Sequence, residues 1–198
     1  MNQSSGAPAS LVVAVARSYR DLGAGMAAFL ERRPRDAQLL VLAMLAGLIG
    51  FLAGLPRAVE QARNLNADDP LTAVMSVRLF GAIFITPLFL FAVAAVGRLV
   101  SRLAGGSGSF WSARAALVWA VMVAQPLVIA NGLVGALATA VPGAAVVANV
   151  VSPGLGIGFL WIWAQHLAEA EGFKRGAVVF GLLLFVCAIP IALALTLR

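Results

Sequence analysis

The chain has 198 residues, of which 62% are hydrophobic and 11% charged, and its mean hydropathy is +0.97. A soluble domain has about 45–50% apolar and about 25% charged residues, so this composition indicates an integral membrane protein. The net charge of +6 comes from basic residues scattered between apolar runs, which argues against nucleic acid as a partner. One cysteine and one histidine exclude an intramolecular disulfide and a zinc site.

Residues 1–34 predict a cytoplasmic tail with an amphipathic helix. Apolar residues recur there at steps of three and four, with charged residues on the opposite side of the helical projection. The apolar set is Val12, Val15, Tyr19, Leu22, Met26 and Phe29, and the charged set is Arg17, Arg20, Asp21 and Glu31. Such a helix binds anionic lipid or a partner protein, or it packs on the protein's own cytoplasmic face.

Residues 35–198 predict a membrane domain, because a span takes about 20 mostly apolar residues. The run from Ala115 to Ala168 has no Asp, Glu, Lys or Arg over 54 residues, enough for two spans, and its turn signals are Pro142-Gly143 and Ser152-Pro153-Gly154. The segment 56–70, bounded by prolines, is a polar connection or a short interfacial helix. The fold class is all-α and polytopic, with five transmembrane helices at about 37–55, 71–98, 112–137, 146–168 and 176–197.

The basic residues set the orientation in the membrane. With the amino terminus inside, ten Lys and Arg residues fall in cytoplasmic segments and three on the other side, with Arg78 at the border. This bias places the amino terminus in the cytoplasm and the carboxyl terminus on the opposite side. Near-complete use of arginine instead of lysine, with abundant alanine and glycine, points to a bacterial host and therefore to its inner membrane.

Four polar residues lie at or near membrane depth. Arg78 either snorkels to the headgroups at the edge of span two or pairs inside the bundle with Glu60, Asp68 or Asp69. Uncharged polar side chains in spans usually hydrogen-bond between helices and less often contact a substrate. This applies to Gln125, Asn131 and Asn149.

Small residues recur every four positions on three of the spans. They are Ala46, Gly50 and Gly54, then Ala116, Ala120 and Ala124, then Gly154 and Gly158. Such spacing lets helix backbones approach closely. Packing within one chain is the first interpretation, and the seam of a homodimer is the second.

The stretch "GGSGS" at 105–109 lacks the lysine and hydroxyl of a phosphate-binding loop and predicts a flexible cytoplasmic turn. No nucleophile with a base and an orienting acid can be assembled from one segment, so we expect neither an enzyme nor a cofactor.

The stretch "WIWAQHLAEAEGFKR" at 161–175 gathers Gln165, His166, Glu169 and Glu171 before Gly172, which predicts a helix terminator. One interpretation is a tight cytoplasmic hairpin at 169–175, with Gln165 and His166 as its membrane-facing shoulder. The alternative is a buried site in which Gln125 or Asn131 contacts His166.

These features together resemble the Yip1 domain family, particularly its short bacterial members, over about residues 35–197. The residues that carry the resemblance are Gly105, Gly106, Gly108, Ser109 and Phe110 before span three, Pro126 within it, and Glu169, Glu171, Gly172, Phe173 and Ala177 after span four. The resemblance implies this membrane fold without known catalysis. Eukaryotic members bind Rab GTPases in vesicle traffic, but their aspartate-leucine-tyrosine-glycine-proline stretch is absent here.

The sequence therefore predicts a non-enzymatic scaffold that organises the lipid bilayer and an unidentified protein partner through its amphipathic helix. The alternative is a small transporter or channel, if the intramembrane polar residues converge on one path.

Overall fold

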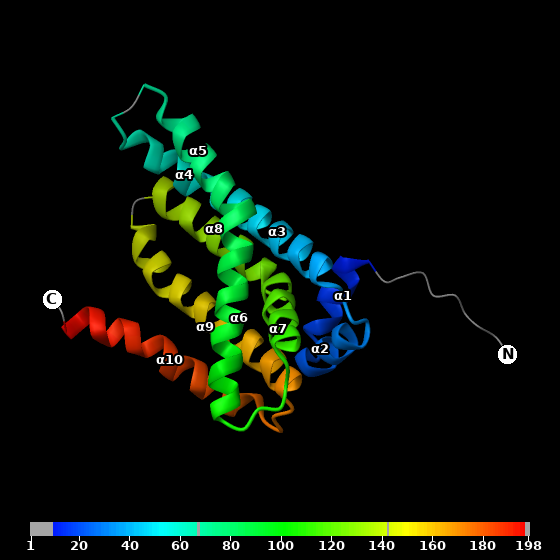
Figure 1. Ribbon diagram of the computed structural model, residues 1–198. Coiled ribbons are helices and arrows are strands. Elements are labelled where there is room, and N and C mark those ends of the chain that lie inside the picture. Colours follow the sequence, from blue (N-terminus) through cyan, green and yellow to red (C-terminus); the bar gives the residue numbers. More distant parts are fainter. Residues whose placement is uncertain (1–9, 67, 142, 197–198) are drawn as a thin grey trace.

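The computed structural model describes residues 10–66, 68–141 and 143–196, with side chains as far as Ala188. The first nine residues of the predicted tail and the predicted turn residue Pro142 lie outside this description. All elements in the described ranges are helices, which confirms the all-α class (Figure 1). They are α1 Leu11–Ser18, α2 Leu22–Glu31, α3 Asp36–Ala53, α4 Leu55–Arg63, α5 Pro70–Phe80, the π-helical turn η1 Gly81–Ile85, α6 Thr86–Leu103, α7 Phe110–Val123, α8 Gln125–Ala140, α9 Ala144–Glu171 and α10 Gly176–Thr196.

Three helical runs are long and apolar enough to cross a membrane: α3, the continuous run Pro70–Leu103, and α9. The pair α7 and α8 gives a fourth if the two helices, bent by 47°, count as one span. The three runs agree with the predicted spans at 37–55, 71–98 and 146–168, and the bent pair lies where the span at 112–137 was predicted. In α10 the described apolar part, Gly176–Ala188, is shorter than a span.

The bend between α7 and α8 follows from Pro126, which lies in the first turn of α8. Proline lacks the N–H that an uninterrupted helix needs, so the helix breaks just before it. Helix α8 ends at Ala140, α9 begins at Ala144 and the two helices pack against each other, so the charge-free run is divided between them. The other turn signal, Ser152-Pro153-Gly154, lies inside α9, as it lies inside the predicted span at 146–168.

The predicted amphipathic helix is divided into α1 and α2 by a break at residues 19–21. Asp21 begins α2 as its N-cap, where the side-chain Oδ1 accepts a hydrogen bond of 2.9 Å from the backbone N–H of Ala24. The apolar stripe is divided as well: Met26 and Phe29 are buried in the bundle, whereas Val12 is 77% exposed.

The core lies at one end of the molecule, around α7. Helices α2, α3, α6 and α9 surround α7 there (Figure 1). Ala116, Ala120 and Ala124 are all buried, which confirms packing within the chain for this row of small residues. At the other end α9 is open, and Val150 is 72% exposed.

The other two predicted small-residue rows agree with the structure only in part, since Ala46 is buried in the core and an added Cβ at Gly158 would lie 3.4 Å from Leu127. A side chain at Gly50 or Gly154 would meet no atom within 4 Å, so neither glycine permits a close approach. The close approach on α3 is at Gly47, where an added Cβ would collide with the carbonyl oxygen of Ala82 in η1. The wide turn of η1 lies just before Pro87, which cannot donate a backbone hydrogen bond.

Candidate functional site

A buried glutamate, Glu171, is the last residue of α9 and is 1% exposed. Its Oε2 accepts hydrogen bonds of 3.0 Å from the guanidinium of Arg98 and 3.0 Å from the backbone N–H of Gly108. Ser107 donates from its backbone N–H and its hydroxyl to the Glu171 carbonyl oxygen, at 3.0 and 3.2 Å. The loop predicted as a flexible turn is thus wrapped around one carboxylate.

Two glycines make this wrapping sterically possible. A Cβ at Gly106 would lie 2.6 Å from Oε2 of Glu171, and a Cβ at Gly108 would lie 2.9 Å from the same atom. Gly172 has φ +75, and the N–H of Phe173 bonds to the carbonyl oxygen of Ala168 at 2.9 Å. This left-handed cap confirms Gly172 as the terminator of α9.

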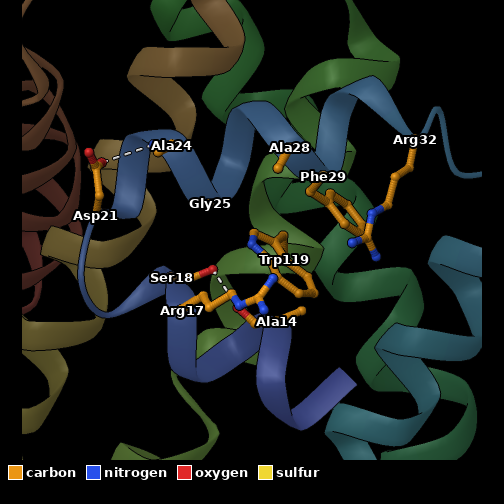
Figure 2. A pocket seen from close by; sticks show the side chains of 10 residues that line it. All are labelled: Ala14, Arg17, Ser18, Asp21, Ala24, Gly25, Ala28, Phe29, Arg32 and Trp119. Carbon is orange, nitrogen blue, oxygen red and sulfur yellow. Dashed lines mark hydrogen bonds between the residues drawn. The ribbon is translucent and has the colours of Figure 1, made fainter. Parts of the chain in front are cut away.

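A cavity of about 220 Å³ lies between α1, α2 and α7 (Figure 2). Phe29 of α2 and Trp119 of α7 stack there with ring centroids 4.5 Å apart and planes 11° apart. Figure 2 shows the side chain of Arg17 extending from α1 toward Trp119, and that of Arg32 extending from the end of α2 toward Phe29. The cavity therefore combines a flat apolar surface with two guanidinium groups.

Helices α1 and α2 are in close contact at Ser18 and Gly25, which both line this cavity. An added Cβ at Gly25 would overlap the hydroxyl oxygen of Ser18, so only glycine lets the two helices meet here. The hydroxyl of Ser18 donates to the carbonyl oxygen of Ala14 at 3.1 Å. The hydroxyl of Tyr19 donates to the carbonyl oxygen of Val123 at 2.6 Å, which ties the segment between α1 and α2 to the end of α7.

Arg78 binds polar groups near the α3–α4 junction. Its guanidinium donates to Oε1 of Gln61 at 2.9 Å and to the carbonyl oxygen of Gly54 at 3.4 Å. The alternative pairing with Glu60 is wrong, because Glu60 pairs with Arg63 at 3.2 Å. Asp68 and Asp69 form no ion pair with Arg78 in the described part of the chain.

The three predicted polar contacts in the spans have different outcomes. Oδ1 of Asn131 accepts a hydrogen bond of 2.7 Å from the hydroxyl of Ser152, which confirms contact between helices. Gln125 is buried, and its amide donates at 2.9 Å to the carbonyl oxygen of Val121, four residues earlier across the break between α7 and α8, so this bond does not join two different spans. Asn149 is exposed on α9.

His166 is fully buried, so its placement as a membrane-facing shoulder is wrong. The alternative partners also fail, since Gln125 and Asn131 are engaged elsewhere. Neither ring nitrogen of His166 has a hydrogen-bond partner among the described residues. Glu169 is exposed beside Gly23 of α2, and Phe110 is exposed at the start of α7.

Sequence reasoning missed the pairing of Arg98 with Glu171 and the position of Arg17 and Arg32 beside a cavity. It used Arg98 and Arg32 only for topology, and Arg17 for topology and for the polar face of the amphipathic helix. The signal in the sequence was weak: Arg98 and Glu171 are 73 residues apart. Among the described residues, no group of three His, Cys, Asp or Glu side chains is placed to hold a metal ion. No protein-family model, curated protein or solved structure in the comparisons matches this chain.

Proposed function

We propose that the chain is a non-enzymatic membrane scaffold that presents α1 to partner proteins at the cytoplasmic face of a bacterial inner membrane. The observation that carries this proposal is the contrast between the first two helices. Met26 anchors α2 in the core, while Val12 and its neighbours leave an apolar face of α1 exposed. An exposed apolar surface held on a rigid support is typical of an interaction site.

The proposed topology has five spans, with α10 as the fifth and the carboxyl terminus on the side opposite the cytoplasm. Residues 176–197 contain no charged side chain, which suits a span. The ends of α6 and α9 and the start of α7 share the arginine-rich end of the molecule, as the pair Arg98–Glu171 illustrates. The positive-inside rule assigns that end to the cytoplasm. This arrangement is the one that the Yip1 resemblance implies.

A small transporter or channel is the second candidate function. It is favoured by a cavity of about 550 Å³ beside α3 and η1, which both Arg78 and Gln125 line. A transport path needs its polar groups to converge, however, and Asn131 and His166 do not line this cavity. Asn131 is occupied by Ser152, and His166 is enclosed in the core. This dispersal of polar groups supports the scaffold more than the transporter.

The scaffold is tested with a photo-crosslinking amino acid placed at Val12 of the full-length protein in living cells. The matched control carries the same group at Leu103, which is exposed at the end of α6. We expect discrete protein adducts from position 12 and none of the same mass from position 103. Sequencing the adducts separates a second copy of this chain from a different partner. Identical adduct patterns at both positions would show that α1 has no partner of its own.

A further inference from the structure

The cavity between α1, α2 and α7 has a neighbour that shares two of its walls. A second cavity, of about 500 Å³, lies beside the start of α3, and Phe29 and Arg32 line both cavities. Ala37, Val41 and Leu42 line the second cavity as well. Val41 is exposed on a helix long and apolar enough to span a membrane, so this second cavity opens on a lipid-facing side of α3.

The first cavity has two guanidinium groups in its lining, whereas the second has only that of Arg32. Arg17 and Arg32 both line the first cavity, and neither forms an ion pair within the described ranges. The carboxylate of Asp21 also lines the cavity, but its Oδ1 already caps α2 by accepting from Ala24 (Figure 2). Guanidinium groups bind phosphate through charge-assisted hydrogen bonds in a geometry that matches its oxygens.

The sizes of the two cavities also fit a ligand with two chemical parts. Pockets that enclose drug-sized ligands measure about 300–1,000 Å³, so the first cavity alone has room only for a small group. The second, larger and lined mainly by apolar side chains, suits hydrocarbon. Arg32 lines both cavities, at the place where the glycerol of a phospholipid would connect its phosphate to its acyl chains.

We propose that these two cavities together bind one anionic phospholipid, with Arg17 and Arg32 holding its phosphate and the α3 side holding an acyl chain. The source of the lipid is the cytoplasmic leaflet, which the proposed topology puts at this end of the molecule. The inference rests on that topology and adds a defined ligand to the scaffold. The lipid would also occupy the space between α2 and α3 and contact both helices.

The test uses full-length protein purified in a mild detergent, with phosphatidylglycerol or phosphatidylcholine added and the bound fraction measured by native mass spectrometry. The variant Arg17→Gln with Arg32→Gln removes both pocket charges. Its matched control, Arg20→Gln with Arg33→Gln, lowers the net charge equally at exposed positions that line neither cavity. We expect phosphatidylglycerol affinity to fall about tenfold or more in the pocket variant and to stay within about twofold in the control.

A second variant separates shape from charge. Ala28→Phe fills the first cavity and keeps both arginines, whereas Ala16→Phe adds the same ring at an exposed position of α1 that lines neither cavity. We expect only Ala28→Phe to release the lipid. Equal loss in both arginine variants would show diffuse attraction to positive charge and overturn the proposal, as would retention of lipid by Ala28→Phe.

A third arm distinguishes a lipid from a soluble anion. Glycerol phosphate or inorganic phosphate is added in excess to the lipid-bound protein. Binding of either anion with displacement of the lipid would assign the cavity to a soluble phosphate and overturn the lipid proposal. Adducts from position 12 report the scaffold separately, so failure of lipid binding with intact adducts would overturn this inference alone.

Discussion

Arg98 and Glu171 form an ion pair of 3.0 Å in which the arginine side chain is 12% exposed and the glutamate side chain 0% exposed. The pair joins α6 to the end of α9, and the same carboxylate oxygen holds Gly108 before α7. Three helices therefore meet at one charge. Because a buried charge is costly unless it is paired, removing one partner leaves the other with the full desolvation penalty.

We expect Glu171→Ala to destabilise the protein by about 3–5 kcal/mol, since it leaves the Arg98 guanidinium without its carboxylate. The matched control is Glu169→Ala, an exposed position on the same helix, where a change within about 0.5 kcal/mol is expected. Thermal unfolding in detergent, followed by circular dichroism, measures both. Equal effects of the two variants would show that the pair contributes nothing specific.

The glycine loop offers a test that changes no charge. A Cβ at Gly108 would lie 2.5 Å from the carbonyl oxygen of Ala170, so Gly108→Ala forces the loop away from α9 and should cost about 1–3 kcal/mol. Gly156→Ala is the control, because nothing lies within 4 Å of an added Cβ there and alanine favours a helix interior by about 0.5–1 kcal/mol. Opposite signs of the two changes in melting temperature are the expected result.

The positions of the helices were largely predictable, because long apolar runs without charged residues define them. The first predicted span, at 37–55, corresponds to α3 at Asp36–Ala53, a helix long and apolar enough to cross a membrane. The charge-free run is also divided between Ala140 and Ala144, where Gly143 has the left-handed conformation that a turn signal based on glycine predicts. The break at Ala124 was missed because proline fits the first turn of a new helix. Pro126 therefore lies at a bend between α7 and α8 and does not end the predicted span.

The side-chain environment was less predictable. In a soluble helix the apolar face identifies the core, but a membrane helix is apolar on all sides, so the sequence does not say which face meets protein. His166 was therefore placed at a shoulder although it is fully buried. The pairing of Glu171 with Arg98 depends on how α6 and α9 pack, which no local pattern encodes.

Tyr19 gives a prediction that depends on pH. In an unbroken helix the N–H of Leu127 would donate to the carbonyl oxygen of Val123. At the break it donates to that of Ala124, and the Tyr19 hydroxyl donates to the carbonyl oxygen of Val123. Partial burial raises the pKa of Tyr19 above its usual value of 10.0. A raised pKa favours the neutral phenol in the folded protein, so this stabilisation is present below pH 10.0 and lost as the pH rises through the folded pKa.

Tyrosinate absorbance measures this directly, because Tyr19 is the single tyrosine of the chain. The expected titration midpoint lies above that of the denatured protein, and Tyr19→Phe should remove the signal and lower stability by about 1 kcal/mol through loss of the hydrogen bond. A midpoint equal to that of the denatured chain would contradict the contact with α7.

The two parts of the amino-terminal apolar stripe, on α2 and on α1, should respond differently when a side chain is replaced by alanine. Met26 is fully buried in the core, so Met26→Ala should destabilise the fold by about 2–5 kcal/mol, because it leaves a cavity between α2 and the bundle. Val12→Ala, on the exposed face of α1, should stay within about 0.5 kcal/mol.

Thermal unfolding measures stability, and the crosslinking assay at a neighbouring exposed position, Val13, measures partner capture. The expected pattern is low stability with α1 unchanged for Met26→Ala, and normal stability with weaker adducts for Val12→Ala. For the same reason, deleting residues 1–34 would disturb the core as well as the interaction surface, so a loss of partner binding after that deletion would not by itself locate the site on α1. A stable Met26→Ala protein would mean that α2, like α1, is held only at the surface.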